Sequence, residues 1–320
     1  MILGGIYSGR LNNAGETLTL KHPLGTRILS VDYKDGGKWP ITPDGFGFSL
    51  VPKNPNANPN PDNPSNWRGS TNPGGSPGQD DPSPVAAGIV INEALTHTDL
   101  PWVDFIELYN PTPEDVNLGG WLLTDDGKTP IKFRIPDNTL IAAGGYLVFT
   151  EADFNPTPGT NGSFTLSSQG EEVYLLSADA NTNLTGYSHG FSFGAAAQGV
   201  SFGRHVISTG DEHFVAQIAR TPGAANSGPL VGPVVLREIM YHPPDLANDV
   251  DNTDDEYVEL RNISAATVQL FDPAYPTNRW RVRGGVDFDF PPGISLGAGQ
   301  SLLLVSFAPT NASTLSAFRG

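Results

Sequence analysis

The chain has 320 residues, with 18 Lys and Arg against 34 Asp and Glu, so its formal net charge is −16. Binding to nucleic acid or to an anionic membrane surface requires clustered Lys and Arg, so this charge balance argues against both partners. The absence of cysteine excludes a disulfide scaffold and a thiolate metal site. No apolar stretch approaches the ~20 residues that span a bilayer, so no membrane insertion is expected.

Short runs rich in branched and aromatic residues are spread along the chain and are bounded by Gly, Pro, Asn or Asp, a pattern that predicts β-strands. In chain order they include 89–95, 103–110, 146–150, 171–177 and 301–307. Helical spacing is not sustained over a dozen residues anywhere. Over 89–227, the close spacing of these short strand-like runs, with turn residues between them, predicts a β-sandwich or small barrel with almost no helix. Its core is expected to contain Trp121, Leu147, Val173 and Leu175.

Several blocks of sequence occur twice. LNNAGETLTL (11–20) returns as LSSQGEEVYL (166–175), GFSL (47–50) as GVSF (199–202), and NPGGSP (72–77) as TPGAANS (221–227). The block 89–110 returns within 234–262, and 135–150 returns within 290–306. Such self-similarity is the signature of a repeated module. The prediction is therefore the C-terminal half of a module at 1–78, a linker at 79–88, a complete module at 89–227, a second linker at 228–233, and the N-terminal half of a further module at 234–320.

The residues of the complete module suggest a family. INEAL and FIELYN, then Gly119-Gly120-Trp121, a strand after Gly144-Gly145 and a closing TPGAANS together resemble the lamin-tail domain. The resemblance covers most of the chain and is greatest to the version found in large secreted bacterial proteins. It implies tandem immunoglobulin-like β-sandwich repeats, a fold that hosts many functions and identifies none. It supplies no catalytic residues and no cofactor, and without coiled-coil sequence an intermediate-filament role is not expected.

One motif has the form of a hydrolase signature. Gly199-Val200-Ser201-Phe202-Gly203 fits G-x-S-x-G, and Asp211 and His213 follow it. That motif works where a strand turns sharply into a helix, and the residues that follow here indicate loop and strand instead. Ser201 is therefore predicted to be a strand residue.

Paired glutamates recur in the repeat. Glu93 with Glu107, and Glu238 with Glu259, could act as acid and base or as metal ligands. Alternatively, they lie on neighbouring strands and contact backbone amides or arginine. Since one catalytic site per repeat is unusual, the structural interpretation is favoured.

The remaining candidates for chemistry are an acidic loop, the histidines and the tryptophans. Residues 245–259 hold seven carboxylates and no base, but an EF-hand is excluded because Asp254 stands where that loop needs glycine. A solvated acidic loop is favoured over a calcium site. None of the histidines has metal-ligand spacing. Trp121 and Trp280 share a repeat position and are expected in cores, whereas Trp102 is the best exposed aromatic candidate.

These observations favour a non-enzymatic β-sandwich segment of a bacterial extracellular or cell-surface protein, with no catalytic, cofactor or metal residues assigned. It would act as a spacer or as an adhesive region for a protein or polysaccharide ligand. The alternative is an accessory carbohydrate- or calcium-binding module of a secreted hydrolase. Head-to-tail self-association through the two half modules is also expected, because half a sandwich leaves a sheet edge unpaired.

Overall fold

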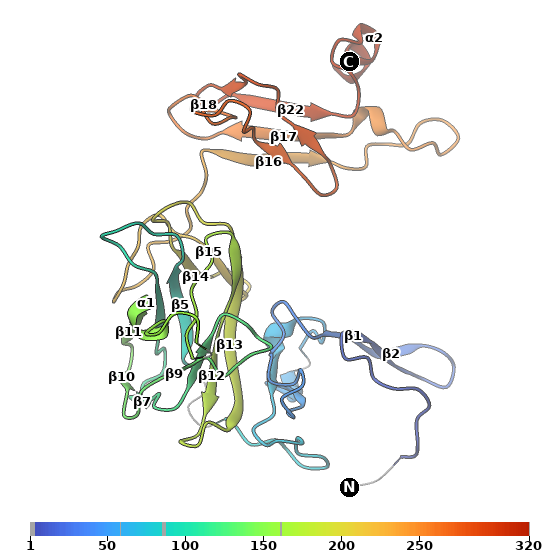
Figure 1. The fold of residues 1–320 in the computed structure, drawn as a ribbon. Helices are drawn as coiled ribbons and strands as arrows, with labels where there is room; N and C mark the ends of the chain where they lie inside the picture. The colour runs from blue at the N-terminus through green and yellow to red at the C-terminus, as the bar shows by residue number, and fades with distance from the viewer. Residues whose placement is uncertain (1–3, 58, 85–87, 161, 320) are drawn as a thin grey trace. The chain divides into compact units, whose positions relative to one another are not determined.

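The computed structural model describes residues 4–57, 59–84, 88–160 and 162–319. The chain divides into two compact units, Met1–Leu230 and Val231–Gly320. Both are built almost wholly of antiparallel strands joined by turns (Figure 1), so the predicted all-β class is confirmed. In the part of the chain that the structure describes, no helix combines the length and the apolar character needed to cross a membrane.

The centre of the first unit is an immunoglobulin-like sandwich of two antiparallel sheets. The first sheet has the strand order β11-β6-β5-β14-β15 and the second has the order β13-β12-β8-β9. The first contains β5 (Val90–Leu95), β6 (Phe105–Tyr109), β11 (Tyr146–Thr150), β14 (Phe202–Val206) and β15 (Glu212–Ala216). The second contains β8 (Leu122–Thr124), β9 (Phe133–Arg134), β12 (Gly170–Ala178) and β13 (Leu184–Gly194). A short pair, β7 (Val116–Asn117) with β10 (Leu140–Ile141), and the one-turn helix α1 (Glu151–Phe154) complete it.

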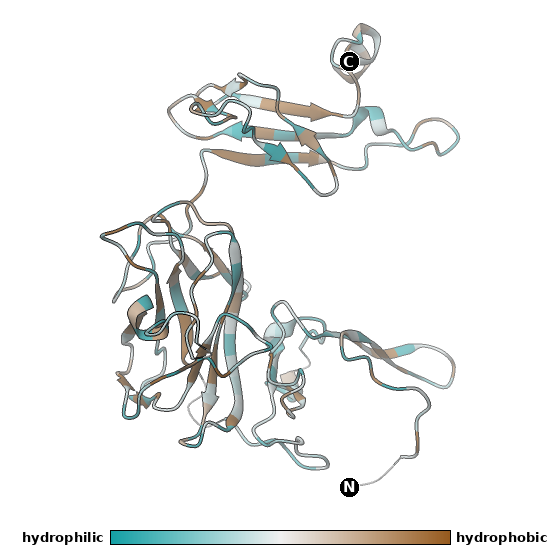
Figure 2. Cartoon of the chain, viewed as in Figure 1, coloured by the Kyte–Doolittle hydropathy of each residue, from teal (hydrophilic) through white to brown (hydrophobic). Residues whose placement is uncertain are grey.

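The sandwich core follows from the alternation of side chains along its strands. Val173 and Leu175 of β12 face the inner core, whereas Tyr174 and Leu176 face outward into a second apolar cluster. Hydrophobic residues are accordingly concentrated on these strands (Figure 2). Trp121, Val173 and Leu175 are buried as predicted. The prediction for Leu147 is wrong: it is only half-buried, because β11 is the edge strand of its sheet.

The N-terminal part of the first unit consists of two hairpins and short turns. Strand β1 (Gly15–Lys21) pairs with β2 (Arg27–Lys34), and β3 (Leu50–Pro52) pairs with β4 (Trp67–Gly69). The 3-10 turns η1 (Pro55–Ala57) and η2 (Pro64–Asn66) lie between β3 and β4.

The segment around β3 and β4 packs against the outer face of the second sheet. Ile41 joins the outward-facing apolar cluster formed by Leu122, Tyr174, Leu176 and Ala178. The buried hydroxyl of Thr42 donates to the carbonyl of Gly186 on β13 at 2.8 Å. The backbones approach so closely that a Cβ on Gly186 would overlap the carbonyl oxygen of Ser70. This second layer of packing makes residues up to Leu230 one unit.

The predicted linker 79–88 lies between these two parts. Asp81 forms an ion pair with Arg68 at 2.5 Å, so the beginning of the linker is fixed to strand β4. Residues 85–87 of the linker lie outside the described residues. The module boundaries stated above stay predictions.

The second unit repeats part of this strand plan. Strand β16 (Val234–Met240) pairs with β17 (Tyr257–Asn262), which pairs with β22 (Ser301–Val305). Two short strand pairs and a 3-10 turn complete this unit's sheet region. They are β18 (Val268–Gln269) with β21 (Ser295–Leu296), β19 (Arg281–Val282) with β20 (Phe288–Asp289), and η3 (Thr253–Asp255). The helix α2 (Ala312–Arg319) was not predicted; it begins after Asn311, whose side chain accepts hydrogen bonds from Ser313 and Thr314 at its first turn.

Equivalent residues of the two units have the same local geometry. The Asn110 side chain donates to the carbonyls of Glu114, Ile141 and Ala142, and the Asn262 side chain donates to those of Ala266, Leu296 and Gly297. A register shift precedes Glu93 in the β5–β6 pair and Glu238 in the β16–β17 pair.

The burial of Trp280 differs from the prediction. Trp121 is 5% exposed, whereas Trp280 is 42% exposed. Trp121 is covered by the β12–β13 sheet, and among the described residues of the second unit no such pair covers Trp280.

Candidate functional site

Ser201 is a buried residue immediately before strand β14, with 1% of its surface exposed. Ser201 was predicted to be a strand residue and lies just before a strand. Because strand β14 follows it and not a helix, the strand-to-helix turn of a hydrolase nucleophile is not formed. Its hydroxyl donates to Oε1 of Glu93 at 2.5 Å. Asp211 instead accepts hydrogen bonds from Asn63 and Thr209. Within the described residues, the hydrogen-bond partner of Ser201 is therefore a carboxylate and not a histidine.

Glu93 and Glu107 face each other in the register of β5 and β6 and are both fully buried. Glu93 accepts the Thr221 backbone N–H at 3.1 Å on each oxygen and the Thr221 hydroxyl at 3.1 Å. Glu107 accepts the Asn92 amide at 2.7 Å and the backbone N–H of Gly223. The two carboxylates thus hold the segment 221–227 against strands β5 and β6.

The environment of these carboxylates is that of a structural hydrogen-bond network. Burial raises the pKa of Glu107, and the hydrogen bonds from Gly223 and Asn92 oppose that rise. Within the part of the chain that the structure describes, the donors to the pair come from the segment 221–227, from Asn92 and from Ser201. These contacts are typical of buried carboxylates that hold segments of a protein together.

The equivalent pair in the second unit has other contacts. Glu238 and Glu259 are opposite each other in register. Glu259 accepts a hydrogen bond from the Arg237 guanidinium at 2.7 Å. Glu238 accepts a hydrogen bond from the Tyr257 hydroxyl at 2.7 Å. Hydrogen bonds from Ser301 and Arg237 lower the pKa of Glu259.

The acidic loop forms a small hairpin, closed by a bridge between Leu246 and Val250. At its base, ligand atoms of His242, Asp245 and Asp251 lie within 4.8 Å of one another, and all three side chains are exposed. An imidazole with two carboxylates could supply three ligands to a divalent cation. His242 was not predicted as a ligand, because no histidine in the sequence has the spacing of a metal-binding motif.

Trp102 is exposed as expected, with 48% of its surface accessible. The guanidinium of Arg220 lies 3.7 Å from the centre of its ring, a cation–π arrangement. The same loop exposes Leu100.

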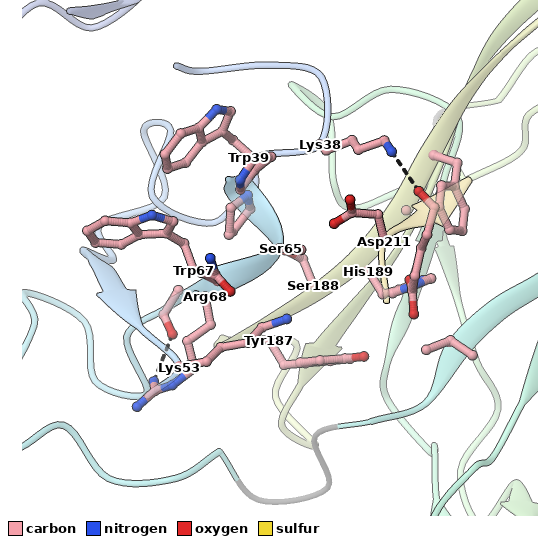
Figure 3. A pocket seen from close by; sticks show the side chains of 18 of the residues that line it. Lys38, Trp39, Lys53, Ser65, Trp67, Arg68, Tyr187, Ser188, His189 and Asp211 are labelled. Carbon is pink, nitrogen blue, oxygen red and sulfur yellow. Dashed lines mark hydrogen bonds and ion pairs between the residues drawn. The ribbon is translucent and has the colours of Figure 1, made fainter. Parts of the chain in front are cut away.

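A concave site with a volume of about 1090 Å³ lies where the segment around β3 and β4 meets β13 and the β14–β15 hairpin. In Figure 3, Trp39 and Trp67 lie on one side, His189 and Asp211 on the other, and Ser65 and Ser188 between them. Sequence reasoning missed this pocket. Part of its wall comes from the Pro-rich stretch 52–64 before Trp67, which contributes Lys53, Asn63 and Pro64.

Buried polar groups form the far wall of this pocket. His189 accepts the Ile91 N–H on Nδ1 at 3.0 Å, and its Nε2 contacts Glu212 at 3.0 Å. Burial lowers the pKa of His189, so the imidazole is neutral with its proton on Nε2. Glu212 also accepts from Arg204 at 2.9 Å. Burial would raise the pKa of Glu212, but the His189 and Arg204 contacts outweigh it and lower that pKa to about 2.

Comparison with known proteins gives one match. Neither the curated proteins nor the solved structures include one that matches the chain significantly. The family model of the lamin tail domain matches residues 82–190. These residues contain strands β5 to β12 and part of β13, hence most of both sheets of the sandwich. The match covers about a third of the chain, and over these residues it confirms the predicted resemblance to the lamin tail domain.

Proposed function

We propose that the chain is a segment of a non-catalytic, extracellular or cell-surface protein in which successive β-sandwich modules act as a stiff spacer. The observation that carries the proposal is the packed contact between the segment around β3 and β4 and the central sandwich. A spacer holds its ends apart only if neighbouring modules cannot rotate freely, and such rotation is the default for modules joined by linkers alone.

The contact combines apolar burial with directional hydrogen bonds. Ile41 is 5% exposed, and burial of such a side chain contributes about 2–3 kcal/mol. Lys38 Nζ donates to the Glu212 carbonyl at 2.7 Å, and the Asn63 amide to Asp211 at 3.1 Å. Together with Thr42, these donors bond to both β13 and the β14–β15 hairpin, which opposes rotation about any one axis.

The buried glutamates support a structural role as well. Their hydrogen bonds attach the C-terminal end of the module to its first two strands, 108 or more residues away in sequence. A module whose ends are tied to its central strands resists unravelling when it is pulled from either end.

Single-molecule energy transfer in the full chain tests the proposal. The chain has no cysteine, so Asn54→Cys and Ala143→Cys, both at exposed positions, give two specific labelling sites in the two parts. A single narrow efficiency peak is expected, and Ile41→Asp should broaden it. A broad distribution in the chain with native Ile41 would contradict the spacer role.

A second function is favoured by the pocket. An accessory carbohydrate-binding module of a secreted hydrolase would need a cleft with aromatic and hydrogen-bonding groups, and Trp67, Ser65 and Ser188 line such a cleft here. Binding of oligosaccharides by the full chain, measured by calorimetry, is the direct test.

A further inference from the structure

The pocket beside Trp39 and Trp67 differs in charge from the rest of the protein. The chain as a whole carries −16, yet the pocket is lined by Lys38, Lys53, Arg68 and Arg204 against Asp211 and Glu212, a sum of +2 with histidines neutral. A locally positive cleft in an acidic protein draws negatively charged ligands toward that cleft.

Most of these charges are already paired. Arg204 contacts Glu212 at 2.5 Å, and Arg68 contacts Asp81 at 2.5 Å. Lys38 donates to a backbone carbonyl. Lys53 differs from these residues. Within the described residues, no carboxylate oxygen lies within 4.0 Å of its ammonium nitrogen, so it forms no ion pair there. Lys53 is therefore the cation left available to a ligand.

The other lining groups fit a sugar. Trp67 is held by a hydrogen bond from its indole N–H to the Pro61 carbonyl at 2.9 Å. Trp39, 6% exposed, supports it with ring centres 5.9 Å apart. A fixed indole provides an apolar face for stacking, and Ser65 and Ser188 line the same pocket (Figure 3). The Ser65 hydroxyl donates to Asn63 Oδ1 at 2.7 Å and can still accept a hydrogen bond from a sugar hydroxyl, and the Ser188 hydroxyl can hydrogen-bond to a sugar as well.

The dimensions agree with an oligosaccharide. The volume of about 1090 Å³ lies slightly above the range of about 300–1,000 Å³ that is usual for ligand clefts. That space accommodates two or three sugar rings, so that one ring can stack on Trp67 while a neighbour reaches Lys53.

We propose that this pocket binds an acidic oligosaccharide, with a uronic acid carboxylate on Lys53 and a sugar ring stacked on Trp67. The proposal rests on the second function above and specifies its ligand. It assigns no chemistry to the pocket: Glu212 is held by Arg204 and His189, and His189 has both ring nitrogens engaged.

Calorimetric titration of the full chain with trigalacturonic acid and with its fully methylated ester tests the proposal, because the ester keeps the sugar rings and their hydroxyls but replaces each carboxylate by an uncharged methyl ester. We expect the acid to bind with a dissociation constant at or below about 1 mM and the ester to bind at least about tenfold more weakly, a difference of about 1.4 kcal/mol. Lys53→Met should remove the preference for the acid, and Trp67→Ala should weaken both probes. Lys128→Met, at an exposed position outside the pocket, should change neither.

The outcomes separate the two proposals. Equal binding of acid and ester, or a preference that survives in Lys53→Met, refutes the acidic ligand and leaves a carbohydrate function standing. If neither probe binds, this inference is refuted. If neutral oligosaccharides also fail to bind, the carbohydrate-binding function is refuted as well.

Discussion

Replacement of Glu93 by alanine tests the structural role of the buried glutamates most directly. The substitution removes the acceptor of three donors: the Ser201 hydroxyl, the Thr221 backbone N–H and the Thr221 hydroxyl. A buried donor left without a partner costs about 1–3 kcal/mol, and Ser201 is 1% exposed. Because the effects of neighbouring donors are not additive, we expect a loss of about 3–5 kcal/mol.

That loss is large against a typical unfolding free energy of about 5–15 kcal/mol. Urea denaturation followed by tryptophan fluorescence measures it, since four of the five tryptophans, Trp39, Trp67, Trp102 and Trp121, lie in the first unit. Hydrogen exchange at the Thr221 amide should accelerate in parallel.

Matched variants sharpen the test. Glu93→Gln keeps the volume and one acceptor but turns an amide N–H toward Thr221, so we expect a loss of about 1–3 kcal/mol. Glu114→Ala, at an exposed position, should stay within about 0.5 kcal/mol of the parent. In Glu93→Ala, a loss below about 1 kcal/mol together with unchanged protection of Thr221 would refute the structural reasoning.

The remaining predictions concern pH, catalysis, cations and association. Burial, as the largest cause, raises the pKa of Glu171 from 4.5 to about 7, so the stability that this group contributes is full below pH 4.5 and is lost as the pH rises through 7. The full shift corresponds to about 3.4 kcal/mol, but Glu171 is only half-buried, and solvent screening reduces the expected effect to about 1 kcal/mol. In urea titrations, Glu171→Gln should therefore gain about 1 kcal/mol relative to the parent between pH 5 and 8, and a constant difference would contradict this. Nitrophenyl ester hydrolysis should stay at background in the parent and in Ser201→Ala, and activity that disappears in the variant would overturn the non-catalytic assignment. Millimolar calcium should leave the melting temperature almost unchanged; a rise of several degrees that is absent in Asp251→Asn would show that the loop binds the ion. Exposed apolar residues, including Leu20 on β1 and Leu236 on β16, predict association that increases with concentration in light scattering, and a monomer at all concentrations would count against it.

Local pattern in the sequence was sufficient for the strands and for the fold class. Alternation and turn residues predicted β5, β6, β11 and β12 because strand formation and chain reversal depend on neighbours a few residues apart. Alignment of the repeated blocks 89–110 and 234–262 also matched Asn110 with Asn262, and the side chains of these two residues make equivalent hydrogen bonds.

Contacts between distant segments were decided only by the tertiary structure. The sequence left two interpretations of Glu93 open, and the contact that distinguishes them is with Thr221, 128 residues away. Leu147 and Trp280 were predicted to be buried, but exposure depends on which strand or sheet covers a side chain, and no local pattern encodes that. The pocket beside Trp67 has the same origin, because its two walls come from segments more than a hundred residues apart that meet only when the first hairpins pack on the sandwich.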